Sequence, residues 1–404
     1  MLQFLWLAFI AQLIAAFVIE RRAGSPFLFV WPIIFLFVGL PIGLEIFGVL
    51  DSQSNQLLAY GLAYGIIFNF CYLGGFCITV MRTQATGMPS DSGDLFRSKR
   101  QFHFFVLAVS VLILGLLLIN GITFSKIIAS SWRDKADMGF VSVVIVWLLS
   151  LLAGCLCFAI DKKYKSSILV ILFVFLTVLA FYRSRGILAN FFIAGAVFWV
   201  LYRKGKVFPL VVASLCAILF AVFIRSVRFL GSFSNVTSFS ELMALFSEHV
   251  SLMFVRGDLS VYKVYLSVVE KCGSELSCFN FTYVSSIGRL LGLASEMGPR
   301  VEYSLYNQMV QDGIGGSLHP TAYGVIYADF SWVGGAVFFL LIGVFHALIR
   351  VVFRGERMLL LLGFVGSYTV FFARGSIYNS LSALVIGIVM AYILALCFRM
   401  KFRV

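Results

Sequence analysis

The sequence predicts an all-α polytopic integral membrane protein with about eleven transmembrane helices and one long helical periplasmic loop. Hydrophobic residues make up 61% of its 404 positions and charged residues only 12%, too few charges to cover a soluble domain of this length. Apolar runs of about twenty residues recur along the chain, and each is long enough as a helix to cross the hydrocarbon core. The runs lack the alternation of barrel strands, so helices must satisfy the backbone in lipid.

The first apolar run, residues 2–19, predicts a retained helix with its amino terminus outside. No basic residue precedes it, and Arg21 and Arg22 follow it directly, which is the reverse of a cleaved secretory signal. The predicted spans are residues 2–19, 26–48, 57–81, 101–119, 138–160, 166–182, 187–202, 207–224, 332–350, 358–373 and 376–398.

The net charge of +13 is distributed as membrane topology requires. The connections predicted to be cytoplasmic hold about three times as many lysines and arginines as the short outer connections, in agreement with the positive-inside rule. We therefore predict that the amino terminus lies on the outer side of the membrane and the carboxyl terminus in the cytoplasm. No basic, aromatic-rich soluble segment is present, so nucleic acid is not an expected partner.

One connection differs from the rest and divides the chain into three parts. Residues 1–224 hold the first eight spans, 225–331 form the large periplasmic loop, and 332–404 hold the last three spans. Helical stretches are also predicted at 258–270 and 283–294. An amphipathic helix is predicted from apolar residues at steps of three and four: Phe239, Leu242, Phe246, Val250 and Met253.

Two of the eight cysteines, Cys272 and Cys278, lie in this loop, whereas the others fall in or beside apolar spans. On the outer face of the membrane the two thiols either form a disulfide or remain free. A zinc site would require two more ligands, which the surrounding sequence lacks.

Arginines at predicted outer positions are the main candidates for ligand binding. Arginine is disfavoured in short outer turns, and burial near lipid is costly unless the charge is paired. Several guanidinium groups suit a pyrophosphate, although each alone can also extend to lipid headgroups or cap a helix. The outer arginines considered are Arg183, Arg185, Arg225, Arg228, Arg256 and Arg374.

The segment "GGSLHPTAYGVIYADFSWVGG", residues 315–335, precedes the ninth predicted span. Its imidazole, His319, is a candidate general base for a sugar hydroxyl, and the alternative is a hydrogen-bonded loop histidine. Tyr323 and Tyr327 follow at helical spacing and are candidates for glycan contact or members of an interfacial aromatic belt. His346 lies near the cytoplasmic side and is interpreted as structural, and Glu45 is the main candidate for an intramembrane acid.

These features resemble the Wzy-type O-antigen (oligosaccharide repeat unit) polymerases. The residues that carry the resemblance are "SRG" at 184–186, arginines leading into one long outer loop, "TAYGVIYADFSWVGG" at its exit, and a late "ARGS". The polymerases are similar in architecture to O-antigen ligases and other GT-C-like glycosyltransferases that use lipid-linked sugars. The sequence contains no Asp-x-Asp motif, Walker loop or Gly-rich dinucleotide fingerprint, so neither a metal nor a nucleotide cofactor is predicted.

The resemblance implies that oligosaccharide repeat units linked to undecaprenyl pyrophosphate are joined on the periplasmic face with inversion. A polysaccharide co-polymerase that regulates chain length is an expected partner. His319, Arg256 and Tyr323 are assigned to catalysis. Pyrophosphate binding is assigned to Arg183, Arg185, Arg225, Arg228 and Arg374.

Three other functions fit a multi-span chain of this kind. An O-antigen ligase would use the same donor and deliver the glycan to the lipid A core. A lipid-linked oligosaccharide transporter or flippase would favour paired repeats, broken helices and charges at the membrane midplane. A non-enzymatic scaffold leaves the outer arginines without a role.

Overall fold

The structure is a computed structural model that describes most of the chain. For residues 84–85, 139–140, 185, 377–379, 395 and 398–399 it describes the backbone alone. Within the described parts the regular elements are helices and no strand occurs. The described residues are 1–50, 53–85, 96, 98–122, 139–182, 185–210, 212–213, 216, 240, 243–244, 246–248, 261–276, 278, 319–353, 355–375 and 377–399.

Seven of the described helices are long and apolar enough to cross a membrane, which confirms the predicted all-α membrane protein. The eighth predicted span, 207–224, falls mostly outside the described residues, so the total of eleven stays a prediction. The seven helices are α1 (Leu2–Ala23), α4 (Asn55–Ala85), α5 (Lys99–Ile119), α8 (Gly139–Asp161), α9 (Lys165–Tyr182), α16 (Thr321–Val352) and α17 (Glu356–Arg374).

Shorter apolar helices account for three further predicted spans. Residues 26–48 form α2 (Val30–Ile34), the π-helix η1 (Phe35–Gly39) and α3 (Leu40–Ile46) rather than one regular helix. The other two are α10 (Arg185–Leu201) and α18 (Ile377–Arg399).

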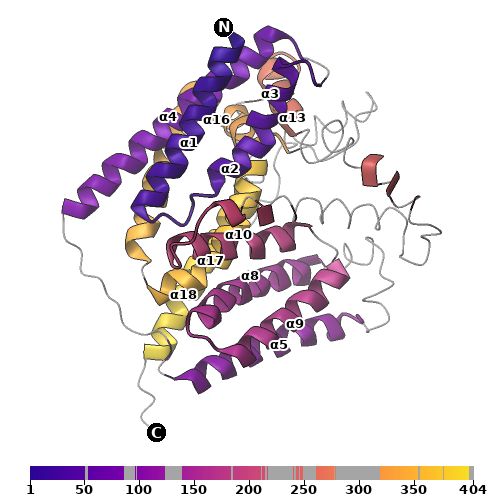
Figure 1. Cartoon of the computed structure of the whole chain (residues 1–404), viewed down its shortest axis with the longest axis vertical. Helices are drawn as coiled ribbons and strands as arrows, with labels where there is room; N and C mark the ends of the chain where they lie inside the picture. The colour runs from indigo at the N-terminus through magenta and orange to yellow at the C-terminus, as the bar shows by residue number, and fades with distance from the viewer. Residues whose placement is uncertain are drawn as a thin grey trace. The chain divides into compact units, whose positions relative to one another are not determined.

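The chain forms two compact units, each assembled from segments that are distant in sequence (Figure 1). The first unit combines residues 1–89, 251–352 and 368–382, and the second combines 90–250, 353–367 and 383–404. The sequence analysis divided the chain into three consecutive parts, with boundaries at residues 224 and 331. The two compact units differ from these parts, because each unit combines three segments that alternate along the chain.

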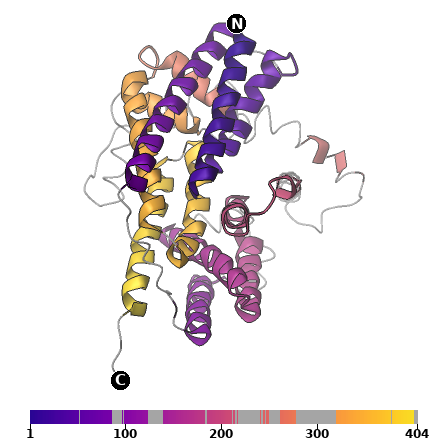
Figure 2. The same cartoon turned by 60° about the vertical axis from the view of Figure 1, so that its left-hand side comes forward.

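In the first unit, α4 packs against both α1 and α16 (Figure 2). The helices approach closely at glycines: a methyl group at Gly75 would lie 2.2 Å from the Leu340 carbonyl oxygen, and one at Gly343 would lie 2.2 Å from the Tyr72 carbonyl oxygen. Small residues permit such backbone approaches between membrane helices, where van der Waals packing drives association. These glycines therefore fix the α4–α16 interface.

We expect Gly75→Ala to destabilise the protein and Gly74→Ala to leave it unchanged or slightly more stable. Nothing lies within 4 Å of a methyl group at Gly74, whereas the same group at Gly75 would collide with backbone. Overpacking costs about 1–3 kcal/mol, while replacing a helical glycine by alanine gains about 0.5–1 kcal/mol. Thermal unfolding of both purified variants in detergent measures the difference, and equal midpoints would contradict this close packing.

Helix α16 contains a break that matches the predicted start of the ninth span. Ser331 adopts φ 58° and ψ −172°, so residues 321–330 form one helical segment and residues 332–352 another. The predicted span began at residue 332, and the helical segment before it carries Tyr323 and Tyr327. The helix therefore carries Tyr323 and Tyr327 at the predicted spacing, but it begins at Thr321, so His319, from which the spacing was counted, lies before it.

The second unit contains α5, α8, α9 and α10, which pack together, and the first part of α17. Close approaches again occur at glycines, because a methyl group at Gly363 would lie 1.7 Å from the Ser150 carbonyl oxygen. Lys162 and Glu356 form an ion pair of 2.8 Å between the turn after α8 and the start of α17. This unit consists largely of apolar helix packing.

Candidate functional site

The candidate site lies in the first unit, where part of the large loop packs on the membrane helices. Helix α13 (Val261–Lys271) confirms the helix predicted at 258–270. It packs against α16 and α4, and its apolar side chains are buried. The predicted helix at 283–294 and most of the amphipathic helix at 239–253 lie outside the described residues.

Two glycines allow α13 to pack closely on its neighbours. A methyl group at Gly61 of α4 would lie 2.5 Å from the Leu266 side chain, and one at Gly324 of α16 would lie 3.2 Å from the Tyr265 ring. The Tyr265 hydroxyl donates to the Gly61 carbonyl oxygen at 2.7 Å. Burial raises the pKa of this hydroxyl well above its ordinary value, so Tyr265 remains a hydrogen-bond donor.

Glu45 holds the other side of α13. Its carboxylate accepts a hydrogen bond from the buried Tyr262 hydroxyl and another, of 3.1 Å, from the Gln53 backbone N–H. Both partners are hydrogen-bond donors, and a carboxylate with two donors is stabilised inside the protein. The acid that the sequence offered as an intramembrane candidate therefore fastens α13 to α3.

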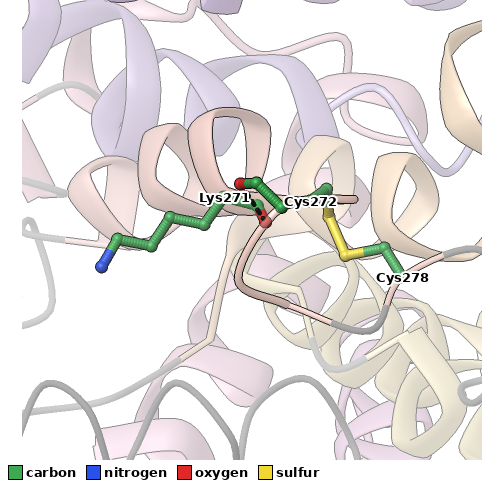
Figure 3. The surroundings of a disulfide bond; sticks show 4 residues. Lys271, Cys272 and Cys278 are labelled. Atoms are coloured by element: carbon green, nitrogen blue, oxygen red, sulfur yellow. Dashed lines mark hydrogen bonds between the residues drawn. A yellow bond between two sulfur atoms is a disulfide. The ribbon is translucent and has the colours of Figure 1, made fainter.

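The end of α13 is closed by a disulfide between Cys272 and Cys278, which confirms the first of the two predicted alternatives (Figure 3). The Cα atoms are 5.4 Å apart, within the range typical of disulfides. The backbone N–H groups of Glu275 and Leu276 donate to the Lys271 carbonyl oxygen, each at 3.0 Å. A short covalent loop therefore ends the helix.

The start of α16 meets the turn that follows α17. A methyl group at Gly375 would lie 2.6 Å from the Thr321 backbone nitrogen and 2.7 Å from its carbonyl oxygen. Gly375 adopts φ 103°, which favours glycine, and its N–H donates to the carbonyl oxygens of Phe371 and Phe372. Only a residue without a side chain fits here, so the "ARGS" turn is packed directly on the "HPTAYG" segment.

This junction brings two of the predicted site residues into one neighbourhood. Arg374 is the last residue of α17 and is partly exposed. His319 lies two residues before α16 and is also partly exposed, next to the buried Pro320. Arg374 is the neighbour of Gly375 in the chain and His319 lies two residues before Thr321, so both are close in sequence to the two residues whose backbones approach each other.

Tyr323, the third predicted site residue that is fully described, is buried in the core rather than exposed. Its hydroxyl donates to the Asn69 side-chain oxygen at 2.6 Å, and its ring lies beside those of Phe68 and Tyr265. This hydroxyl is already paired, which suits a residue that positions the start of α16. Its predicted contact with substrate stays a prediction. The Tyr327 ring lies tilted against the Tyr64 ring, with centroids 4.9 Å apart.

The remaining predicted arginines are not placed by the structure. The structure describes only the backbone of Arg185, which begins α10. The convergence of these groups with Arg374 stays a prediction. The predicted residues outside the described parts of the chain are Arg183, Arg225, Arg228 and Arg256.

Two buried polar atoms beside this site were not identified from the sequence. The Asn69 side-chain nitrogen and the Thr321 hydroxyl have no hydrogen-bond partner among the described residues. A lone asparagine within the apolar run "GIIFNFCYLGG" was the available signal for the first. Buried polar groups are nearly always hydrogen-bonded, so each of these atoms is expected to have a partner beyond the described residues.

Comparisons with models of protein families, with curated protein sequences and with solved structures found no match for this chain.

Proposed function

We propose that this chain is a GT-C-like membrane glycosyltransferase that polymerises oligosaccharide repeat units linked to undecaprenyl pyrophosphate. In this proposal it crosses the bacterial inner membrane eleven times, with a periplasmic amino terminus and a cytoplasmic carboxyl terminus. The observation that carries the proposal is the contact between Gly375 and Thr321. It joins two short motifs on which the resemblance to Wzy-type polymerases depends, although they lie more than fifty residues apart in the sequence.

The disulfide supports the proposed orientation of the large loop. Disulfides persist in oxidising compartments such as the periplasm and are rare in the cytosol. With residues 225–331 outside, the His319–Thr321 segment and the Arg374–Gly375 turn would also lie at the periplasmic end of their helices. That end is where lipid-linked repeat units would be presented.

The proposed reaction transfers the growing glycan to a new repeat unit. A hydroxyl of the acceptor attacks the anomeric carbon of the donor, and the bond from that carbon to the pyrophosphate oxygen breaks with inversion. The acceptor hydroxyl proton passes to His319, and undecaprenyl pyrophosphate leaves. Arg374, with the other outer arginines, would offset the negative charge that develops on the leaving group.

Reconstitution tests this function directly. Purified protein in lipid vesicles would receive repeat units linked to undecaprenyl pyrophosphate, without added nucleotide or metal. Products with two or more repeat units are expected. Failure to extend any repeat unit, by a folded preparation with a matched lipid-linked substrate, would reject the proposal.

A gene deletion separates the polymerase from the ligase alternative. Loss of a polymerase leaves a single repeat unit on the lipid A core, whereas loss of a ligase leaves the core without any. The ladder of lipopolysaccharide on a gel distinguishes these outcomes.

We expect a membrane-impermeant maleimide to label Cys272 and Cys278 on intact cells only after treatment with an impermeant reductant. The two sulfur atoms are bonded to each other, so they cannot react before reduction. Mass spectrometry of the labelled peptide measures the result, and the Cys272→Ser/Cys278→Ser variant is the control for other thiols. Labelling without reduction would contradict the disulfide, and labelling only after cell lysis would contradict the proposed outer position.

A further inference from the structure

A continuous hydrogen-bonded chain of six polar side chains is buried in the first unit, apart from the candidate site. Glu20 accepts from Ser25 (2.6 Å) and Trp31 (2.7 Å), and the Tyr72 hydroxyl lies 2.6 Å from its Oε1. The same hydroxyl lies 2.7 Å from Nδ1 of His346, whose Nε2 lies 2.9 Å from the Tyr368 hydroxyl. All six side chains are at most 1% exposed.

The chain connects a carboxyl group to an imidazole through a single hydroxyl. Tyr72 has one hydroxyl hydrogen, so it donates either to Glu20 or to His346 at a given moment. If it donates to Nδ1, Glu20 must be protonated and donate to the Tyr72 oxygen. If it donates to Glu20, Nδ1 must carry a hydrogen and donate to the Tyr72 oxygen. In both arrangements every bond of the chain is satisfied.

We propose that Glu20, Tyr72 and His346 form a proton relay that holds one transferable proton within the membrane-spanning helices. One form contains a carboxylic acid and a neutral imidazole that keeps its Nε2 hydrogen. When Glu20 passes its proton to Tyr72 and Tyr72 passes its own to Nδ1, the result is a carboxylate and an imidazolium. No proton is gained or lost in this step. The inference is independent of the proposed glycosyl transfer.

The turn between α1 and α2 is bound to both ends of the relay. Ser25 donates to Glu20, and the Phe27 ring stacks on the His346 ring with centroids 3.8 Å apart and planes 11° apart. A hydrogen bond to a carboxylate is stronger than one to a neutral acid, and a cation is attracted to an aromatic face. The charge-separated form therefore holds residues 24–29 more firmly than the neutral form.

A purely structural connection between helices does not require a carboxyl group and an imidazole. Ionisable residues inside membrane spans are costly and usually mark proton or substrate pathways. A serine, an asparagine or a second tyrosine would connect α4 to α16 without an acid or a base. The pairing of a carboxyl group with an imidazole across one hydroxyl is the arrangement that proton transfer requires.

Other titratable and charged side chains lie on the elements packed around the relay. Cys77 is within electrostatic reach of Tyr72, and the exposed Arg21 and Arg22 follow Glu20 directly on α1. The remaining titratable or charged side chains on α1, α2, α4, α16 and residues 368–374 are Tyr60, Tyr64, Cys71, Arg82, Tyr323, Tyr327, Asp329, Arg350 and Arg374. His346 is the one imidazole among these elements, so its nitrogen signals report on the relay directly.

The full-length protein, labelled with ¹⁵N at its four histidines and placed in lipid bilayers, provides the test. Solid-state NMR at a series of pH values follows Nδ1 and Nε2 of His346, which a His346→Asn variant assigns. Tyr72→Phe and Glu20→Gln are each expected to displace the His346 midpoint by about one pH unit or more, the displacement typical of coupled groups. The double variant Glu20→Gln/Tyr72→Phe should have the same His346 midpoint as Tyr72→Phe alone.

Tyr323→Phe is the matched control, because it also removes one buried hydroxyl from the first unit but leaves the relay intact. The proposal is overturned if Tyr72→Phe and Tyr323→Phe give the same midpoint. It is also overturned if His346 keeps one set of nitrogen shifts throughout the series.

A second measurement uses the unmodified protein and does not depend on how the variants fold. Hydrogen exchange of the backbone amides of residues 24, 25 and 27–29 is followed over the same pH series. Protection of these amides should change at the His346 midpoint, and a midpoint unrelated to His346 would reject the coupling.

Discussion

We expect Arg374→Ala to abolish polymer formation while the protein remains folded in the membrane. The proposed leaving group is a pyrophosphate, and Arg374 ends α17 beside the segment that carries His319. Removing one preorganised donor to a developing negative charge costs about 10²–10³ in rate. The ladder of surface polysaccharide in cells and the extension of repeat units in vesicles measure the loss.

Arg82→Ala is the matched control for this substitution. Both arginines lie in the last turn of an apolar helix, where a cation interacts favourably with the helix dipole, but Arg82 lies near the end of α4 that is proposed to be cytoplasmic. Arg374→Lys should retain part of the activity, because lysine keeps the charge but not the guanidinium fork. Normal polymer from Arg374→Ala would reject the assignment.

The sequence predicts the same loss of polymer formation for substitutions of Arg185 and Arg228. Alanine at either position should remove the polymer ladder without loss of membrane protein, because several guanidinium groups are proposed to share one pyrophosphate. Full-length polymer from both variants would show that Arg374 does not act with them.

The spans were predictable because apolar runs and flanking charges are local properties of the sequence. The first span was predicted to end at residue 19, whereas α1 continues to Ala23. Arg21 and Arg22 extend the helix because long basic side chains reach water from its last turn. Gly24, with φ 73°, then ends it.

Features that depend on distant contacts were not predictable. The span at 26–48 was expected to be continuous, but it contains a π-helix whose last residue, Gly39, accepts a hydrogen bond of 2.7 Å from the Trp6 indole. Nothing within 26–48 indicates that a side chain of the first span occupies this position. The interleaving of the two units likewise depends on packing between segments far apart in the chain.

The role of Glu20 was missed although the sequence contained a signal for it. The buried positions of α1 include Phe9, Leu13, Ala16 and Glu20, at steps of four, three and four. This spacing places the acid on the core face of the helix. The sequence interpretation used the adjacent Arg21 and Arg22 for topology and gave Glu20 no role. His346, interpreted as structural, is the other end of the same buried chain.

The second large effect is expected from Glu20→Leu, which should destabilise the first unit severely. Leucine fills a similar volume but leaves the Ser25 hydroxyl, the Trp31 indole N–H and the Tyr72 hydroxyl without this acceptor. A buried donor left unsatisfied costs about 1–3 kcal/mol. Tyr72 can still donate to Nδ1 of His346, so the Ser25 and Trp31 donors together cost roughly 2 kcal/mol or more.

Thermal unfolding in detergent, read by the recovery of folded protein after heating, measures this loss. Glu270→Leu is the control, because it makes the same substitution at an exposed position of α13. Glu20→Gln should fall between the two, since its amide keeps one acceptor oxygen for the three donors. If Glu20→Leu unfolds at the same temperature as Glu270→Leu, the buried carboxyl does not hold α1, α2 and α4 together. The six-residue chain would then be a consequence of the packing rather than a cause of it.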